Sequence, residues 1–206
     1  MCRQPPIFRS SARPVQNRMV QKDEEVEIAV VDRSRWSDLE QLFESRGGPK
    51  SCWCMVWRTM PERPQRSDGP SRKRAMKGRV QAGQPVGLLA YRDGAPAGWC
   101  SVAPRPTYKQ LGGLTYEGVS EDAVWSIVCF FVTRAARGNG IFERLLTEAI
   151  THAQASGAAV VESYPVDPDS PSYRFMGFVS SFEAFGFEEV GRAGSRRHVM
   201  SLRTGR

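Results

Sequence analysis

A short basic turn contains the residues of this sequence that are best suited to binding a phosphorylated ligand. Residues 137–142 read RGNGIF, and the glycines at positions 138 and 140 leave the backbone open to close approach. If a helix begins here, its first amides are unpaired and its dipole adds partial positive charge, so a phosphate group can bind. A glycine-containing connection with solvated arginines remains the alternative interpretation.

The elements on either side of this turn suit a phosphate site. Residues 124–132 are almost wholly apolar and rich in β-branched and aromatic side chains, which predicts a strand covered on both faces. After the turn, apolar residues recur at the three- and four-residue spacing of a helix with one buried face: Ile141, Leu145, Leu146, Ala149, Ile150 and Ala153. Residues 158–164 predict a second buried strand, which completes a parallel strand–helix–strand unit.

The rest of the chain predicts further elements around this unit. Before it we expect a strand at 26–31, helices at 34–45 and 71–82 separated by a loop at 59–70, a hairpin at 86–91 and 95–103, and a long irregular segment at 107–122. After it we expect a loop at 165–177, a short helix at 180–186, and a hairpin formed by 187–190 and 197–202.

The length and composition predict one domain with a tail. In the 206-residue chain, we interpret residues 1–20 as a flexible basic tail and residues 21–206 as a single domain, since 40% hydrophobic content supports a sizeable core. No apolar run approaches the roughly 20 residues that a membrane-spanning helix needs. The first residues also lack the apolar core of a signal peptide, so we expect a cytoplasmic protein without membrane contact.

The net charge indicates which classes of partner are favoured, and the cysteines indicate the state of the thiols. A net charge of +7 favours an anionic partner: a phosphorylated cofactor, an acidic substrate or a nucleic acid. Nucleic acid is the least favoured, because the basic stretches lack interleaved aromatic residues. Five cysteines are an odd number without a Cys-x-x-Cys pair, so we expect reduced thiols and no metal site.

Two motifs resemble those of the GNAT superfamily of acyl-CoA-dependent N-acetyltransferases. Residues 137–142 resemble its acyl-CoA motif, Arg/Gln-x-x-Gly-x-Gly/Ala, with Gly140 at the first glycine and Phe142 at the last small position. Residues 182–187, FEAFGF, resemble its closing Tyr-Glu-x-x-Gly-Phe pattern, with Phe182 in place of the tyrosine. The resemblance covers about residues 26–202. It implies a GNAT-like α/β fold of the α+β type: a mixed, mostly antiparallel central sheet with a splayed parallel strand pair and flanking helices.

The resemblance also implies an activity and a cosubstrate. It predicts an N-acetyltransferase that moves an acetyl group from acetyl-CoA directly to a primary amine of a small molecule or peptide, as a monomer or homodimer and without a metal. Main-chain groups of Phe130, Phe131 and Val132 are expected to hold the acetyl and pantetheine arm. The expected pyrophosphate-binding residues are Arg137, Gly138, Asn139, Gly140, Ile141 and Phe142.

Proton transfer needs residues that the closing motif does not supply, because Phe182 has no hydroxyl to protonate a thiolate. Tyr164 and Tyr173 are the candidates for that role, and Ser181 or water remain possible. Glu162, on the strand at 158–164, is the preferred candidate base, because burial can raise the pKa of a carboxylate toward neutrality. A hydrogen-bonded structural carboxylate is the alternative interpretation of this residue.

Residues 51–58, SCWCMVWR, are the second conspicuous segment. Trp53 and Trp57 predict an acceptor pocket whose aromatic faces hold an amine, with core packing as the alternative. Two other functions stay open for the whole chain: a regulatory domain that binds acyl-CoA without turnover, and a nucleic-acid-binding protein. The identity of the acceptor does not follow from the sequence.

Overall fold

The computed structural model describes residues 26–60 and 68–205. The predicted tail at 1–20 and positions 61–67 of the predicted loop therefore lie outside the described residues. None of the described helices is long and apolar enough to cross a membrane.

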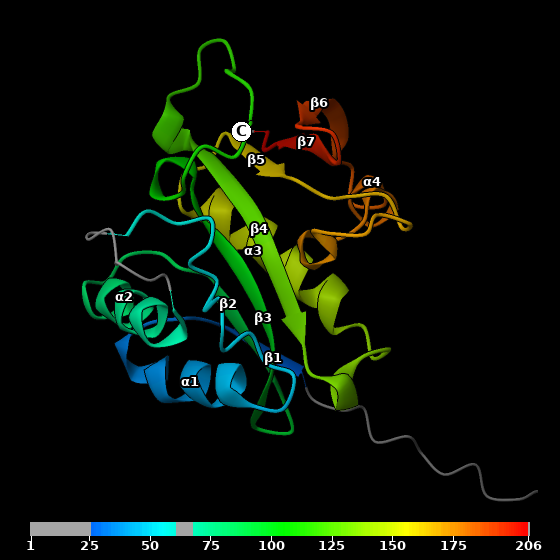
Figure 1. Cartoon of the computed structure of the whole chain (residues 1–206). Coiled ribbons are helices and arrows are strands. Elements are labelled where there is room, and N and C mark those ends of the chain that lie inside the picture. Colours follow the sequence, from blue (N-terminus) through cyan, green and yellow to red (C-terminus); the bar gives the residue numbers. More distant parts are fainter. Residues whose placement is uncertain (1–25, 61–67, 206) are drawn as a thin grey trace, which may run out of the picture.

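A mixed sheet forms the centre of the molecule (Figure 1). Its strands are β1 (Val26–Val30), β2 (Leu88–Arg92), β3 (Ala95–Pro104), β4 (Val124–Val132), β5 (Val160–Ser163), β6 (Glu188–Ala193) and β7 (Arg197–Arg203), arranged in the order β1-β2-β3-β4-β5-β7-β6. The pair β4–β5 is parallel and the other neighbouring pairs are antiparallel. This arrangement confirms the predicted fold class.

The helices begin and end within a few residues of the predicted positions. They are α1 (Trp36–Glu44), α2 (Gly69–Gln81), α3 (Ile141–Ala155) and α4 (Val179–Glu183), with 3-10 turns η1 (Arg33–Arg35), η2 (Arg105–Thr107), η3 (Glu121–Ala123), η4 (Arg134–Ala136) and η5 (Arg174–Met176). The helix expected at 34–45 is preceded by η1, because the Asp32 side chain accepts hydrogen bonds from the backbone amides of Ser34 and Arg35.

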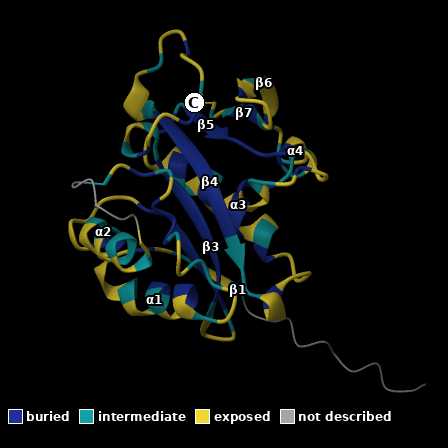
Figure 2. Ribbon diagram, in the orientation of Figure 1, coloured by how far each residue is buried: buried dark blue, intermediate teal, exposed yellow. Residues whose placement is uncertain are grey.

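Two hydrophobic cores lie on the two faces of the sheet, and Figure 2 shows its central strands, such as β3 and β4, as largely buried. Side chains alternate along β2, so Leu88 contributes to the core under α3 while Leu89 contributes to the core under α1 and α2. The apolar face of α3 is buried as the spacing predicts, and α3 thereby fixes the position of the turn at its N-terminus.

The segment expected to be irregular, residues 107–122, contains parts of η2 and η3 and holds the 51–58 segment in place. The backbone amide of Lys109 donates to the carbonyl of Trp57 at 2.8 Å, and Arg58 bridges to Tyr108. Segments that are far apart in the chain therefore meet on the face of the sheet opposite α3.

Candidate active site

The glycine turn between β4 and α3 has the backbone that the phosphate-site prediction requires. Gly138 and Gly140 have φ of +81° and +69°, and a Cβ at either would have no neighbour within 4 Å. Gly140 is the N-cap of α3 and no side chain caps the helix. The first amides of α3 are therefore free of a side-chain partner at an open turn.

A pocket of about 360 Å³ lies at this turn. It is lined by Val132, Ala136, Arg137, Gly138, Gly140, Ile141, Phe142 and Glu143. Arg137 Nε donates to the carbonyl oxygen of Val132 at 3.1 Å, which holds the turn against the end of β4. The Phe142 ring packs on Phe130 with centroids 4.5 Å apart, so the large side chain at this small-residue position turns toward the core.

β5 pairs along its whole length with β4, but only with the first four residues of β4. Their register runs from Val124 opposite Val160 to Ile127 opposite Ser163. The register of β4 with β3 shifts between Ser101 and Val102, which places a bulge at Val128. Beyond the bulge, residues 128–132 have no described strand partner on the β5 side, and η5 packs there instead. This unpaired edge contains Phe130, Phe131 and Val132, the residues expected to offer main-chain groups.

The two tryptophans of the 51–58 segment lie in different environments. Trp53 is 2% exposed and packs against Trp36 and Phe43 in the core under α1. Trp57 is half-buried and packs against Tyr173, with ring centroids 6.0 Å apart. Only Trp57 of this pair is therefore placed where an acceptor could reach it.

Glu162 is the centre of a buried polar network. Its side chain has no exposed surface. Its Oε1 accepts from Arg105 Nη1 at 3.0 Å, from the Leu114 amide at 3.1 Å and from the Tyr116 hydroxyl at 2.8 Å. Its Oε2 accepts from the Tyr164 hydroxyl at 2.6 Å and from Arg105 at 3.0 Å. The carboxylate is thus both ion-paired and hydrogen-bonded on each oxygen.

The surroundings of Glu162 keep the tyrosines protonated. Burial, together with the charge of Glu162, raises the pKa of Tyr164 well above its ordinary value. Burial and the same carboxylate also raise the pKa of Tyr116. A Cβ at Gly113 would collide with the carboxylate of Glu162, so this glycine allows the loop to lie directly on the network.

Tyr173 and Phe182 lie at the unpaired edge of β4. Tyr173 directly precedes η5 with a φ of 62°, which is uncommon for a residue with a side chain. Tyr173 is half-buried, and its hydroxyl makes no hydrogen bond with any residue that the structure describes. Phe182, on α4, is fully buried and packs on Phe130 and Phe187. Tyr173 thus offers the uncommitted hydroxyl that Phe182 lacks.

Two arginines of this region were not among the predicted site residues. Arg105 joins Glu162 to Glu121, and Arg197 stacks on Trp57. Both reach the site from distant parts of the chain, so no local sequence pattern marks them. Among the described residues, no group of three His, Cys, Asp or Glu side chains could hold a metal ion.

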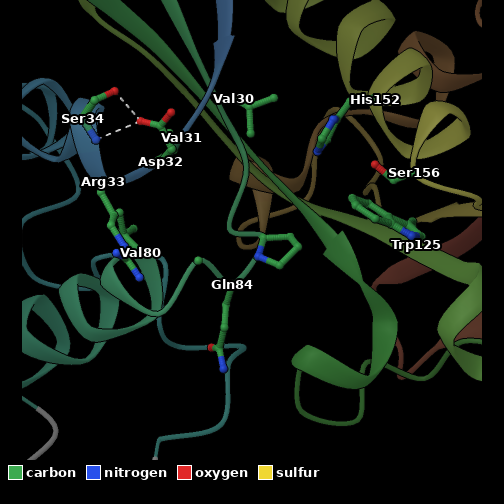
Figure 3. Close-up of a pocket in the computed structure, with 12 residues that line it drawn as sticks. Val30, Val31, Asp32, Arg33, Ser34, Val80, Gln84, Trp125, His152 and Ser156 are labelled. Atoms are coloured by element: carbon green, nitrogen blue, oxygen red, sulfur yellow. Dashed lines mark hydrogen bonds between the residues drawn. The ribbon is translucent and has the colours of Figure 1, made fainter.

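A larger pocket lies elsewhere. It has a volume of about 650 Å³ and lies between the end of β1, the end of α2 and the C-terminal part of α3. Figure 3 shows His152 and Trp125 on one side of it and Ser34 on the other. Burial lowers the pKa of His152, whose ring meets Trp125 edge-on. None of the predicted site residues lines this pocket.

A mixed sheet whose parallel strands separate beside a glycine turn and a helix N-terminus is the architecture of acyl-CoA-dependent acyltransferases. Residues 50–178 match the model of the acetyltransferase (GNAT) family. Because this match spans more than half of the chain, the protein belongs to the GNAT acetyltransferase family.

Solved structures share this fold at low sequence identity. The PaiA N-acetyltransferase of Thermoplasma acidophilum, in complex with coenzyme A, is 13% identical, with a TM-score of 0.53, over 87% of this chain and 99% of that one. YncA of Salmonella typhimurium with its cofactor acetyl-CoA is 17% identical, with a TM-score of 0.51, over 86% and 93%. PH1933 of Pyrococcus horikoshii OT3 is 18% identical, with a TM-score of 0.55, over 88% and 99%. No curated protein sequence matches the chain.

Proposed function

We propose that this protein transfers an acetyl group from acetyl-CoA directly to a primary amine of a small molecule or peptide. The observation that carries the proposal is the unpaired edge of β4 at 128–132, which leads directly into the open turn at Gly138 and Gly140. Edge amides and helix-terminal amides suit a long ligand with an acyl group at one end and phosphates at the other. Acetyl-CoA supplies an activated thioester when bound.

The residues of the turn fit the phosphates of such a ligand. The first-turn amides of α3 and the Arg137 guanidinium provide positive potential around the pocket of about 360 Å³. Main-chain groups of Phe130, Phe131 and Val132 hold the acetyl and pantetheine arm. Phe142 lines the same pocket with an apolar ring. Asn139 and Ile141 complete the turn.

Transfer forms a C–N bond at the amine and breaks the C–S bond, so one proton must leave the amine and one must reach the departing sulfur. Tyr173 donates to the sulfur, since its hydroxyl has no described partner and stays available. Glu162 accepts the amine proton by way of the Tyr164 hydroxyl, which donates to it at 2.6 Å. Both side chains are fully buried, so this transfer requires the site to open when the amine binds.

A binding domain without turnover is the second candidate. The buried Phe182 at the family's tyrosine position, and a Glu162 whose oxygens are both occupied, favour it. Both candidates require acetyl-CoA binding, but turnover separates them.

The test combines binding with turnover. Acetyl-CoA at about 100 times its dissociation constant should stabilise the protein by about 2.7 kcal/mol and raise its melting temperature. Release of free thiol with a panel of amines should then detect transfer. Tyr173→Phe should lower kcat by about a hundredfold with unchanged acetyl-CoA affinity, whereas Tyr108→Phe, at a buried tyrosine outside the proposed machinery, should not. Binding without thiol release from any amine would support the second candidate, and absence of binding would reject both.

A further inference from the structure

An arginine inside an aromatic cluster lies next to the point where β4 and β5 separate. The Arg197 guanidinium lies 4.6 Å from the ring centroid of Trp57, 5.5 Å from that of Tyr173 and 6.0 Å from that of Tyr164. Trp57, Tyr164 and Tyr173 pack in one apolar cluster with Val128, the bulge residue of β4. We call these three aromatic residues and Arg197 the aromatic–arginine cluster.

Four separate parts of the chain build this cluster. Trp57 comes from the 51–58 segment, Tyr164 follows β5, Tyr173 precedes η5, and Arg197 is the first residue of β7 (Figure 1). The convergence of these four parts on the bulge places the arginine on the side of β4 that the proposed acceptor must approach.

The guanidinium of Arg197 is only partly used by the protein. Its Nη1 donates to the carbonyl oxygen of Leu111 at 3.0 Å. Its Nε and Nη2 make no hydrogen bond, and no carboxylate pairs with it, among the residues that the structure describes. Arg105, by contrast, pairs with both Glu121 and Glu162. Partial burial lowers the pKa of Arg197, and the side chain stays partly exposed, so its unpaired nitrogens can be reached by a ligand.

Another donor of the cluster also lacks a partner. Trp57 Nε1 is buried without a hydrogen-bond partner in the described structure. Buried polar groups are usually hydrogen-bonded, so an unpaired donor at a site calls for an explanation. A ligand that brings oxygen acceptors into the cluster would provide one.

We infer that Arg197 binds a carboxylate of the acceptor, so that the substrate is a small amine that also carries a carboxylate. The free Nε and Nη2 form the side-on fork of a guanidinium, which matches the two oxygens of a carboxylate. The rings of Trp57 and Tyr173, tilted by 51° to each other, pack around the guanidinium and restrict the orientation of this fork. The inference rests on the proposed acetyl transfer and adds the class of acceptor.

The first experiment uses the unmodified protein and matched pairs of acceptors. Each pair consists of an amine with a free carboxylate and the same compound as its carboxamide; the panel contains free amino acids and short peptides with a free C-terminus. With saturating acetyl-CoA, the carboxylate form should have a KM at least about tenfold lower than the amide, because charge-assisted hydrogen bonds are the stronger kind. Comparing free amino acids with peptides shows whether the preferred carboxylate belongs to an amino acid or to the C-terminus of a peptide.

The second experiment assigns the preference to Arg197. Arg197→Met keeps an apolar stem in the cluster but removes the fork, and should abolish the KM difference between acid and amide. Arg197→Lys keeps the charge and loses the planar fork, so it should retain only part of the KM difference between acid and amide. Arg196→Met is the matched control, since Arg196 is exposed on the neighbouring position and its Nη1 donates to Ser172 Oγ. It should leave the difference unchanged.

Each outcome bears on one of the two proposals. Turnover with equal KM for acids and amides in the unmodified protein would overturn the carboxylate inference while leaving acetyl transfer intact, even if Arg197→Met does not fold. A loss in Arg197→Met that is the same for acids and amides would also overturn it, because only packing would then have changed. If no amine is acetylated, the affinities of the same acid and amide pairs are measured by calorimetric titration in the presence of coenzyme A. Tighter binding of the acids supports the inference, and equal binding rejects it.

Discussion

Gly140 has a backbone conformation on which the phosphate-binding proposal depends. Its φ of +69° lies in the left-handed region, and the space around its Cβ position is open. Gly140→Val should therefore strain the turn and place two methyl groups beside the first amides of α3. We expect the acetyl-CoA dissociation constant to rise at least about tenfold, or ~1.4 kcal/mol, in calorimetric titration.

Gly157 provides the matched control for this prediction. It follows α3 with a φ of +89° and also has no neighbour within 4 Å of its Cβ position. Gly157→Val should impose a similar backbone cost at the opposite end of α3 and leave acetyl-CoA affinity unchanged. Equal affinities in Gly140→Val and the unmodified protein would mean that the phosphates bind elsewhere. An equal loss in both variants would attribute the effect to general strain.

Contiguous site residues could be predicted from the sequence, and residues brought together by the fold could not. The turn at 137–142 forms one run, so its glycines and basic charge are visible together. Arg105 pairs with Glu162 across 57 positions of the chain, and Arg197 meets Trp57 from the start of β7. Because such pairings depend on how the strands are ordered, no local spacing indicates them.

At the scale of elements, the 51–58 segment directs its two tryptophans into different environments, although they look alike in the sequence. Trp53 and Cys54 both have positive φ, 47° and 48°, which breaks any regular helical or strand periodicity. Trp53 consequently turns into the core and Trp57 toward Tyr173. From the sequence, Trp53 or Trp57, or both, were expected to line the acceptor pocket, because aromatic content was visible whereas these backbone conformations were not.

Replacing each tryptophan by alanine should reveal the two roles. Trp53→Ala should lower the free energy of unfolding by about 3–5 kcal/mol, since it removes a large side chain that is 2% exposed. Trp57→Ala should keep acetyl-CoA affinity and raise the acceptor KM by about ten- to a hundredfold through lost apolar and cation–π contacts. Urea unfolding and steady-state kinetics measure the two effects.

The two variants serve as controls for each other. If Trp57→Ala unfolds the protein as Trp53→Ala is expected to, the half-buried ring is part of the core. If Trp57→Ala weakens acetyl-CoA binding and leaves acceptor kinetics unchanged, the acceptor assignment fails. Arg58, the last residue of the segment, is fully buried and donates to the Val86 carbonyl, Ser101 and Tyr108, so the segment should remain anchored in both variants.

At the scale of the whole molecule, the order of elements was predicted more completely than their arrangement. Periodicity locates the strand at 124–132 and the helix after it, because each buries a continuous apolar surface. The separation of β4 from β5 depends on a bulge at Val128 and on β7 pairing with β5. These are non-local features, and the resemblance to a known family, rather than local pattern, predicted the splayed pair.

Buried tyrosines make the stability of the whole fold sensitive to alkaline pH. Burial raises the pKa of Tyr108 to about 12, from an ordinary value of 10.0. Burial also raises the pKa values of Tyr91, Tyr116 and Tyr164. Above pH 10 the unfolded chain loses these protons while the folded protein retains them, so unfolding becomes more favourable as pH rises. The stabilising contribution is therefore fully present below pH 10 and is lost through the folded-state pKa values.

Urea unfolding between pH 8 and pH 11.5 should follow this linkage. We expect a stable plateau up to about pH 10 and then a decline, to which Tyr108 alone contributes about 2 kcal/mol by pH 11.5. Tyr108→Phe should be less stable at pH 8, because Tyr108 bonds to Arg58 and Ser101, but its decline above pH 10 should be shallower. A decline of the same slope in Tyr108→Phe would show that other groups release the protons. A plateau that persists to pH 11.5 would mean that these tyrosines ionise equally readily in the folded and unfolded states.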